Sequence, residues 1–275
     1  MHTHTRPTAV SRMIHLYHND MSVCAQKVRL TLAELGLAWE SHHLKLRGDE
    51  QLRPEYLRIN PKGQVPAIID GDVVVVESTV INEYLVDSCG TDWLLPASAA
   101  GRARMRWWTR QLDDDVHLAT GAMSQAIAFR HQYLATGPEM VEQILEHIPD
   151  EQRRDFKRKA FSTGMDNPDL PRAARRMNKL FADIETALDK DEWLAGDRFS
   201  LADTGITPYV ARMEHLEMTM MFEERPNLRS WFARIKARPS FAEAMVKWFN
   251  PDYLVLTRAE GIKAQPRIAE MLKVD

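Results

Sequence analysis

The sequence pattern changes near residue 90. Over residues 13–90, short apolar runs alternate with amphipathic stretches in the order βαβαββα. Within this part, Asp70-Gly71-Asp72 separates two β-branched runs, which is typical of a hairpin. From about residue 99 onward, only helical periodicity remains. A chain with this pattern is expected to fold as an α/β domain followed by an all-α domain, and we predict a helical bundle for the second part.

The same change predicts where the domains begin and end. We expect a flexible tail at residues 1–12, the α/β domain at 13–90 and a linker at 91–99. The all-helical domain is expected to occupy residues 100–275 and to end in a C-terminal tail. Residues 102–128 form one long helical pattern within it.

The composition and net charge of the chain argue against several classes of binding partner. A net charge of −3 gives no electrostatic reason for binding nucleic acid or an anionic membrane. No run approaches the roughly 18 apolar residues of a membrane span, and the first residues lack the apolar stretch of a secretory signal. The two cysteines, Cys24 and Cys89, form neither a disulfide framework nor a metal-ligand pattern. We therefore expect a cytoplasmic protein that binds no metal.

Two segments of the first domain have the chemistry to bind an amino-acid-like group. In residues 60–66, Pro66 directly precedes an apolar strand and leaves a backbone edge free for a peptide. Glu77 and Ser78 stand where a run of valines meets a helix. The unpaired N–H groups at the start of that helix, together with the Ser78 hydroxyl, suit a carboxylate, and Glu77 suits an amine.

A third segment, residues 20–29, is the turn from the first strand into the first helix. Ser22 lies just before this helix, where its hydroxyl and the helix dipole can stabilise an anion; a plain N-cap is the alternative. Cys24 lies in the first turn, either as a thiol that packs under the helix or as a nucleophile that forms a mixed disulfide. Position 27 is Lys27, so there is no Cys-x-x-Cys pair.

Taken together, these segments resemble the glutathione transferase superfamily. The likeness covers roughly residues 13–250, and its motifs occur in the family's order. They are Val65-Pro66, Glu77-Ser78, Ile81, Tyr84-Leu85 and Ser200-Leu201-Ala202-Asp203. The resemblance implies a thioredoxin-like first domain, a helical domain that binds a hydrophobic electrophile, glutathione as co-substrate, a role in detoxification and a homodimer.

The resemblance also implies roles for individual residues. Val65 would pair its backbone with the cysteinyl part of glutathione, and Pro66 would be cis. Glu77 and Ser78 would bind the γ-glutamyl end. Ser22 aligns with the catalytic serine of zeta-like classes and with the cysteine of omega-like classes.

Other candidates for glutathione binding lie nearby. Arg53 aligns, across a one-residue gap, with a lysine that helps to bind glutathione in omega-like members. Lys62 and Gln64 share the loop before Val65. In several classes an acid on the helix that carries residues 113–115 reaches the glutathione of the partner subunit, although a solvated stretch is the simpler interpretation of Asp113-Asp114-Asp115. Three consecutive helical aspartates point in different directions and cannot hold one ion.

The electrophile pocket is predicted from aromatic and flexible apolar residues expected at the domain junction. The same residues could equally belong to the core, and His117 could be packed rather than reactive. The candidates are Met21, Trp107, Trp108, His117, Phe129, Trp248 and Phe249.

The helical domain is longer than in the common classes, mainly through residues 130–171. This segment is polar, is interrupted by prolines and carries a basic cluster at 153–159 that we expect to be solvated. It resembles bacterial transferases similar to the lignin β-aryl etherases, in which glutathione displaces a phenol beside an aryl ketone. Three functions stay open: a serine-type glutathione transferase, a glutathione-dependent thiol oxidoreductase that uses Cys24, and a non-catalytic module that binds glutathione or a hydrophobic ligand.

Overall fold

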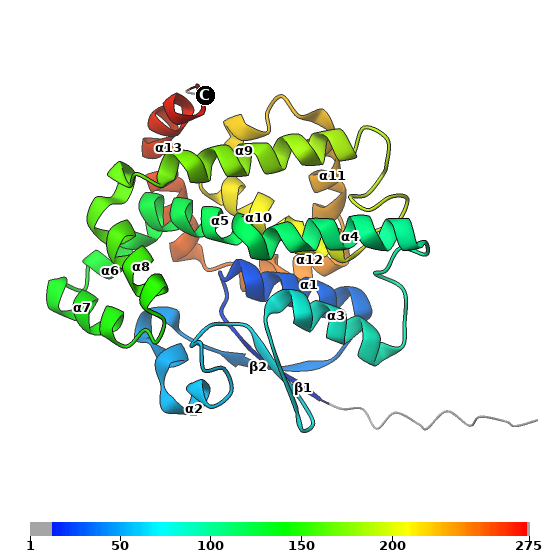
Figure 1. The fold of residues 1–275 in the computed structure, drawn as a ribbon, viewed down its shortest axis with the longest axis horizontal. Helices are drawn as coiled ribbons and strands as arrows, with labels where there is room; N and C mark the ends of the chain where they lie inside the picture. The colour runs from blue at the N-terminus through cyan, green and yellow to red at the C-terminus, as the bar shows by residue number, and fades with distance from the viewer. Residues whose placement is uncertain (1–12, 274–275) are drawn as a thin grey trace, which may run out of the picture.

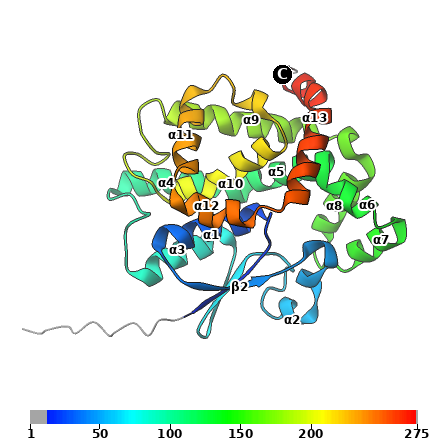
Figure 2. The ribbon, with the colours of Figure 1, turned by 180° about the vertical axis from the view of Figure 1, so that it is seen from behind.

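A four-stranded sheet and a bundle of helices lie on opposite sides of helix α1 (Figures 1 and 2). The computed structural model describes residues 13–273. The first part follows the predicted order: β1 (Ile14–His18), α1 (Val23–Leu35), β2 (Trp39–His43), α2 (Pro54–Leu57), β3 (Ala67–Asp70), β4 (Val73–Val76) and α3 (Ser78–Cys89). Two 3-10 turns, Leu46–Gly48 and Glu50–Leu52, precede α2.

The remainder of the described chain is helical. Its α-helices are α4 (Ala99–Gln111), α5 (His117–Ser124), α6 (Arg130–Leu134), α7 (Pro138–Glu146), α8 (Glu151–Thr163), α9 (Leu170–Ala187), α10 (Leu201–His215), α11 (Pro226–Lys236), α12 (Pro239–Ala244) and α13 (Pro251–Lys273). The predicted fold class, an α/β domain followed by an all-α domain, is confirmed. The exact domain boundaries stay a prediction, and the tail expected at residues 1–12 lies outside the described residues.

The strands of the sheet lie in the order β2-β1-β3-β4. β1 and β2 run parallel, whereas β3 pairs antiparallel with both β1 and β4. Asp70 pairs with Val73, so the predicted hairpin closes through the two residues Gly71 and Asp72. Gly71 has a φ of 61°, as the first position of a II′ turn requires. This hairpin pairs β4 with β3, and α3 begins two residues after β4 ends.

Helices α1 and α3 cover one face of the sheet, and the short α2 lies on the other side (Figure 1). Ser22 caps α1 by accepting a hydrogen bond from the Ala25 amide at 3.3 Å, and Gly36, with a φ of 64°, ends the helix. The apolar side chains between these helices and the sheet are Ile14, Leu16, Val28, Leu32, Ile68, Ile81 and Leu85. Packing on this face fixes the start of α1 near the start of α3.

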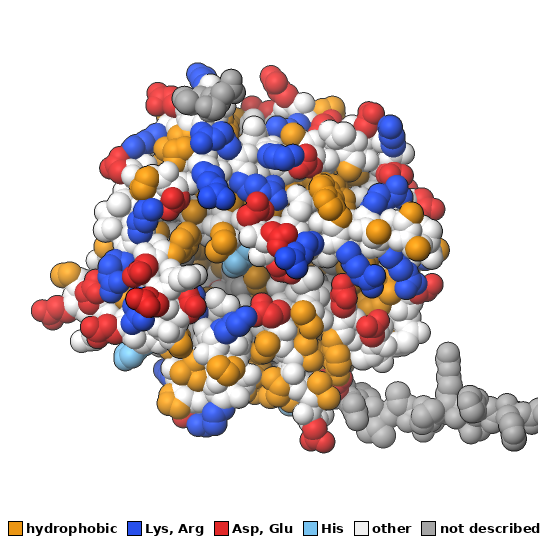
Figure 3. Space-filling view, viewed as in Figure 1, with side chains coloured by type: hydrophobic (Ala, Val, Ile, Leu, Met, Phe, Trp, Pro, Cys, Tyr) orange, Lys and Arg blue, Asp and Glu red, His pale blue; other side chains and the backbone are white. Residues whose placement is uncertain are grey.

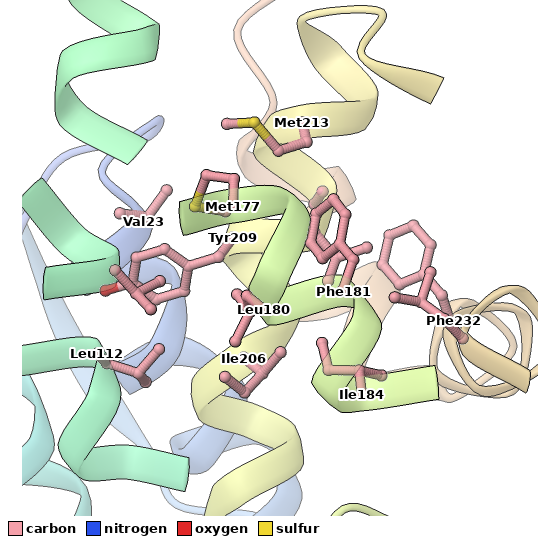
Figure 4. Close-up of a cluster of buried hydrophobic side chains, with 14 of the residues drawn as sticks. Val23, Leu112, Met177, Leu180, Phe181, Ile184, Ile206, Tyr209, Met213 and Phe232 are labelled. Carbon is pink, nitrogen blue, oxygen red and sulfur yellow. The ribbon is translucent and has the colours of Figure 1, made fainter. Parts of the chain in front are cut away.

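Helix α10 runs through the middle of the bundle, where nearly all of its residues are buried. The predicted box at its start is present: Ser200 and Asp203 cap each other's backbone, and Asp203 also accepts from the Trp231 indole at 2.9 Å. Figure 4 shows apolar side chains of α9 and α10 packed together, with Val23 of α1 in the same cluster. The two domains therefore share a core.

The long helical pattern expected over residues 102–128 extends from α4 to α6. Two π-helical segments, Leu112–Val116 and Gln125–Phe129, interrupt it. Each inserts an extra residue into a helical turn and so rotates the side chains that follow. The first π segment sets the direction of His117.

Residues 130–171 hold α6, α7, α8 and the start of α9, and the weak periodicity does not predict α7 and α8. Pro138 and Pro171 stand in the first turns of α7 and α9, where a missing N–H costs little, so they start helices there. The residues expected to form a C-terminal tail form α13, whose Ala264 and Ile268 are buried in the core. No helix within residues 13–273 is long and apolar enough to cross a membrane.

A partly buried ion pair also joins the domains. Glu34 of α1 accepts two hydrogen bonds from the Arg238 guanidinium, both at 2.7 Å, and a third from the Ser240 hydroxyl. Burial would raise the pKa of Glu34, but the hydrogen bonds from Arg238 and Ser240 outweigh it and hold the pKa below its ordinary value. The carboxylate therefore stays charged at the domain junction.

Candidate active site

The start of α1 presents Ser22 at the junction of the two domains. The Ser22 side chain is half-buried, and its backbone carbonyl accepts from the Gln26 amide at 2.9 Å. Met21 just before it is buried, and its carbonyl accepts a hydrogen bond from the Arg212 guanidinium of α10. Arg212 thus fixes the backbone that carries Ser22. The Ser22 hydroxyl and the first N–H groups of α1 form a site with positive potential, which suits an anion.

Cys24, in the first turn of α1, lies against a histidine from the helical domain. The distance from Cys24 Sγ to His117 Nδ1 is 3.5 Å, and the Tyr209 hydroxyl lies 4.0 Å from the sulfur. Burial would raise the pKa of the Cys24 thiol, but the charges of His117 and Lys27 and the hydroxyl of Ser78 bring it down to about 6. The negative charge of Cys24 in turn raises the pKa of His117. The pair favours a thiolate beside an imidazolium.

Lys27 connects this pair to the start of α3. Its side chain is buried, and Nζ donates to the Thr79 hydroxyl at 3.1 Å, which donates to Asp113 at 3.0 Å. The neighbouring aspartates contact other residues: Asp114 pairs with Arg110 and Asp115 with Arg176, each at 2.7 Å. Each of the three aspartates therefore has its own partner, as their helical spacing predicts.

The loop before β3 has the geometry expected for a peptide-docking edge. The Val65–Pro66 bond is cis, as the resemblance implies. The Gln64 carbonyl accepts from the Tyr56 hydroxyl at 2.5 Å and from the Asn60 side chain at 2.7 Å. Val65 is half-buried, and the Gln64 side chain is exposed. Tyr56 and Asn60 thus fix the backbone of the loop, and Val65 stays partly accessible at its surface.

Glu77 has an unusual backbone at the start of α3. Its φ is 68° and its ψ is 113°, a conformation that costs a residue with a Cβ about 1–3 kcal/mol and is found mostly at functional sites. The exposed Lys62 ammonium lies 2.6 Å from the Glu77 carboxylate, which raises the pKa of Lys62. Ser78 is buried. Glu77, Ser78 and Lys62 are therefore brought together.

Arg53 is not brought into this group. Its side chain is exposed and pairs with Glu50 of its own loop at 3.8 Å. Arg153 of α8 reaches the loop in its place, because it donates to the carbonyls of Lys62 at 2.8 Å and Gly63 at 3.3 Å. Sequence analysis missed this residue and assigned it to a solvated face, since the apolar face of α8 has a weak periodic signal.

Two more cations lie on the same side as Arg153. The Arg47 guanidinium donates to the Tyr133 hydroxyl at 3.0 Å and lies over the rings of Phe129, Tyr133 and Tyr253. Lys157 Nζ lies 5.4 Å from the centre of the Tyr133 ring. Burial lowers the pKa of Lys157, and the charges of Arg153 and Arg47 lower it further. Sequence analysis has no signal for Arg47, and it places Lys157 on a solvated face.

Of the remaining predicted pocket residues, Phe129 lies nearest to this group, since its ring stacks with Arg47 and Arg212. Trp108 belongs to the core, where its indole donates to the Leu194 carbonyl at 2.8 Å, whereas Trp107 is exposed. Neighbouring helical positions point about 100° apart, so both could not face one pocket.

The predicted pocket residues Trp248 and Phe249 lie away from the group around Phe129 and Arg47. Trp248 packs edge-on against His18, with ring centres 4.6 Å apart, and lies beside Trp39 of β2. Phe249 packs edge-on against His215, with ring centres 4.8 Å apart. Trp248 therefore packs the 3-10 turn after α12 against the sheet, and Phe249 packs against the end of α10. In the space-filling view the surface is hollowed between the helical domain and the sheet domain (Figure 3).

This arrangement is that of a glutathione-binding enzyme, and comparison with known proteins agrees. Residues 21–88 match the family described as glutathione S-transferase, N-terminal domain, and residues 147–239 match the C-terminal domain of the same family. The chain belongs to the glutathione S-transferase family and is a glutathione transferase, which activates the glutathione thiolate for attack on an electrophile.

Individual relatives show which members of the family this chain is similar to. The chain is 30% identical to protein LigF of Sphingobium sp. strain SYK-6, over 88% of this chain and 96% of the relative. It is 28% identical to the tetrachloro-p-hydroquinone reductive dehalogenase of Sphingobium chlorophenolicum, over 85% of this chain and 96% of the relative. The crystal structure of β-etherase LigF superposes with a TM-score of 0.78 over 86% of this chain and 99% of that chain.

Proposed function

We propose that Ser22 and the start of α1 hold the glutathione thiolate during attack on a hydrophobic electrophile. The observation that carries this proposal is the position of Ser22 as the N-cap of a helix whose start lies close to Ser78. Lowering a thiol pKa from about 8.5 by about two units requires roughly 2.7 kcal/mol. A hydrogen bond to a charged group contributes about 1.5–3 kcal/mol and a helix N-terminus about 0.3–2 kcal/mol. One hydroxyl and one helix dipole are enough.

The rest of the tripeptide would lie along the loop before β3. Val65 would pair its backbone with the cysteinyl residue beside Pro66, and Glu77 and Ser78 would bind the γ-glutamyl group. Gln64, which is exposed beside Val65, is a further candidate contact. The conformation of Glu77 supports this assignment, because such strain is usually retained where it serves binding.

The glycyl carboxylate would lie near the basic side of the site. Arg153 already contacts the carbonyls of Lys62 and Gly63, and Arg47 and Lys157 add positive charge behind it. Arg53 could contribute only after leaving Glu50. We therefore assign the carboxylate to Arg153 first and keep Arg53 as an outer contact.

The electrophile would enter between α1 and the π-helical segments. His117, Tyr209 and Phe129 are the side chains from the helical domain that support this placement, with Met21 beneath Ser22. Similarity to LigF, whose structure is described as that of a β-etherase, favours an aryl ether as the electrophile. Glutathione sulfur would then form a bond to the substrate carbon as the phenolate leaves.

A second activity, thiol–disulfide exchange, is favoured by the Cys24–His117 pair. The Cys24 thiolate would attack the glutathionyl sulfur of a mixed disulfide, forming a Cys24–glutathione disulfide and releasing the other thiolate. A second glutathione thiolate would then attack that glutathionyl sulfur, giving glutathione disulfide and regenerating Cys24. The low pKa of Cys24 is suited to both steps.

Separate alanine variants distinguish the two activities. Ser22→Ala should abolish conjugation of an aryl electrophile and leave disulfide exchange, whereas Cys24→Ala should do the reverse. If Cys24→Ala lost as much conjugation activity as Ser22→Ala, Cys24 would have to take part in the main reaction. Conjugation unaffected by Ser22→Ala would overturn the proposal.

We also propose that the enzyme is a cytoplasmic homodimer. Val73 and Val74 of β4, Val80 of α3 and Trp107 of α4 are exposed apolar side chains. Figure 3 shows apolar side chains gathered on the face that carries β4 and α3. Val80→Glu should yield monomers in sedimentation velocity, whereas Val255→Glu, a control at an exposed position of α13, should not. A monomeric parent protein would exclude the dimer.

A further inference from the structure

His15, Glu40 and His42 converge on the sheet face opposite α1 and α3. The parallel register places His15 of β1 beside Glu40 of β2, and alternation along β2 places His42 on the same side as Glu40. His15 Nδ1 lies 3.0 Å from His42 Nε2 and 3.6 Å from one oxygen of Glu40. His42 Nε2 lies 3.4 Å from the other oxygen. Two imidazole nitrogens therefore face each other and the two oxygens of one carboxylate, and one ligand atom from each residue lies within 4.8 Å of the others.

These separations are close to the distances between neighbouring ligand atoms in a tetrahedral metal site. Zinc binds histidine nitrogen at about 2.0–2.1 Å and carboxylate oxygen at about 2.0–2.2 Å, so neighbouring ligand atoms lie about 3.3–3.5 Å apart. The nitrogen–nitrogen distance of 3.0 Å is shorter than this range, and the two nitrogen–oxygen distances, 3.6 and 3.4 Å, lie close to it but involve different oxygens of Glu40, so a bound ion would draw one of these oxygens toward both rings. All three side chains are partly open to solvent, which leaves the fourth position for water.

A hydrogen bond between the two rings is a less complete explanation. One proton shared by His15 Nδ1 and His42 Nε2 satisfies only that contact, and the acceptor nitrogen then faces a carboxylate oxygen of Glu40 with no hydrogen between them. A cation at the centre would attract all three donors at once. Two imidazoles and one carboxylate are ligands that zinc prefers in proteins.

We propose that His15, Glu40 and His42 bind a divalent transition-metal ion, zinc foremost, which ties the edge strand β2 to β1. Sequence analysis expects no metal, because the strand register that brings His15 beside Glu40 cannot be read from the spacing of the residues. Bound zinc would stabilise the folded chain by mass action. The site uses none of the residues assigned to glutathione, so it is tested separately from the transferase activity.

The test is zinc titration of the full chain after treatment with a chelator, followed by calorimetry and thermal unfolding. The variants are His42→Gln, Glu40→Gln and, as a matched control, His43→Gln. His43 is on the same strand but lies near Asp20, at 3.7 Å, away from the proposed ligands. All variants keep the other histidines, so binding elsewhere is common to every sample.

One zinc per chain is expected in the parent and in His43→Gln, with affinity at least tenfold lower in His42→Gln and Glu40→Gln. Saturating zinc should raise Tm by about 3 °C or more only in the first two proteins. Cobalt should give the visible absorption of a tetrahedral site that is lost in His42→Gln, which tests the geometry independently of stability. No stoichiometric binding, or equal binding by His42→Gln, would overturn the proposal.

Discussion

Cys24 Sγ lies 3.5 Å from His117 Nδ1, although the two residues belong to different domains. The thiol is on the first turn of α1, and the imidazole follows directly after a π-helical segment. Their contact crosses the junction at which Ser22 is also presented. One helix start therefore carries two groups: the Ser22 hydroxyl, which we propose stabilises the glutathione thiolate, and the Cys24 thiol, which forms a thiolate of its own.

His117→Asn should slow the reaction of Cys24 with iodoacetamide about tenfold at pH 7. The pKa of Cys24 is about 6 with His117 in place, so the thiolate predominates at neutral pH. Without the imidazolium the pKa rises and the thiolate fraction falls, partly offset by higher intrinsic nucleophilicity. The measurement is alkylation rate against pH in a Cys89→Ser background, because Cys89 is exposed. His131→Asn, on exposed α6, is the control, and an unchanged pH profile in His117→Asn would contradict the pairing.

Arg153→Ala should raise KM for glutathione about tenfold with little change in kcat. The reason is that Arg153 is proposed to attract the glycyl carboxylate and holds the carbonyls of Lys62 and Gly63, both remote from the sulfur. Steady-state kinetics with varied glutathione gives both constants. Arg154→Ala removes the neighbouring charge and should leave KM nearly unchanged; an equal effect in both variants would mean that only net charge matters.

Glu77→Gly should be more stable than Glu77→Ala by about 1 kcal/mol, the reverse of the usual order within helices. At a φ of 68° alanine retains the clash of its Cβ, whereas glycine does not. Urea unfolding of both variants measures the difference. Both should also bind glutathione more weakly than the parent, since each lacks the carboxylate. Equal stability of the two would show that the backbone relaxes at this position.

Arg238→Ala should lower the free energy of unfolding by about 2–4 kcal/mol, because it leaves the Glu34 carboxylate buried without its partner. Urea unfolding is the measurement. The exposed pair of Arg110 with Asp114 provides the control, and Arg110→Ala should cost less than about 1 kcal/mol.

The Glu34 pair also predicts a direction of pH dependence. Its pKa is lower in the folded than in the unfolded chain, so the stabilisation is complete above the ordinary carboxyl range. It is lost as the pH falls through the lowered folded value. The difference in stability between the parent and Arg238→Ala should therefore shrink in acid; a difference that grows there would contradict the assignment.

The sequence predicted features that depend on neighbouring residues. The hairpin at Gly71, the N-cap at Ser22 and the capping box of Ser200 with Asp203 each need only a few consecutive residues. The contacts of His117, Arg153 and His15 depend on how distant segments meet. The two π-helical segments change the direction of the side chains after them, and no local signal announces such a change.

The basic residues of α8 show why burial was misjudged. Arg153 and Lys157 lie one turn apart: Arg153 donates to the loop that contains Gly63, and Lys157 lies over the Tyr133 ring. Arg158, in contrast, pairs with Glu142 at the surface. Long basic side chains can bury their stems and bring their charges to a site, so charge alone does not indicate a solvated face. Residue type alone likewise could not tell that Trp108 is buried in the core and that Trp107 is exposed.

The central claim, that Ser22 and the start of α1 hold the glutathione thiolate, is tested most directly by titrating the thiolate absorbance of bound glutathione. The account predicts a midpoint about two units below the free value of about 8.5 in the parent and in Cys24→Ala. In Ser22→Ala the midpoint should return most of the way to the free value. A shift that persists in Ser22→Ala, or that disappears only in Cys24→Ala, would contradict it.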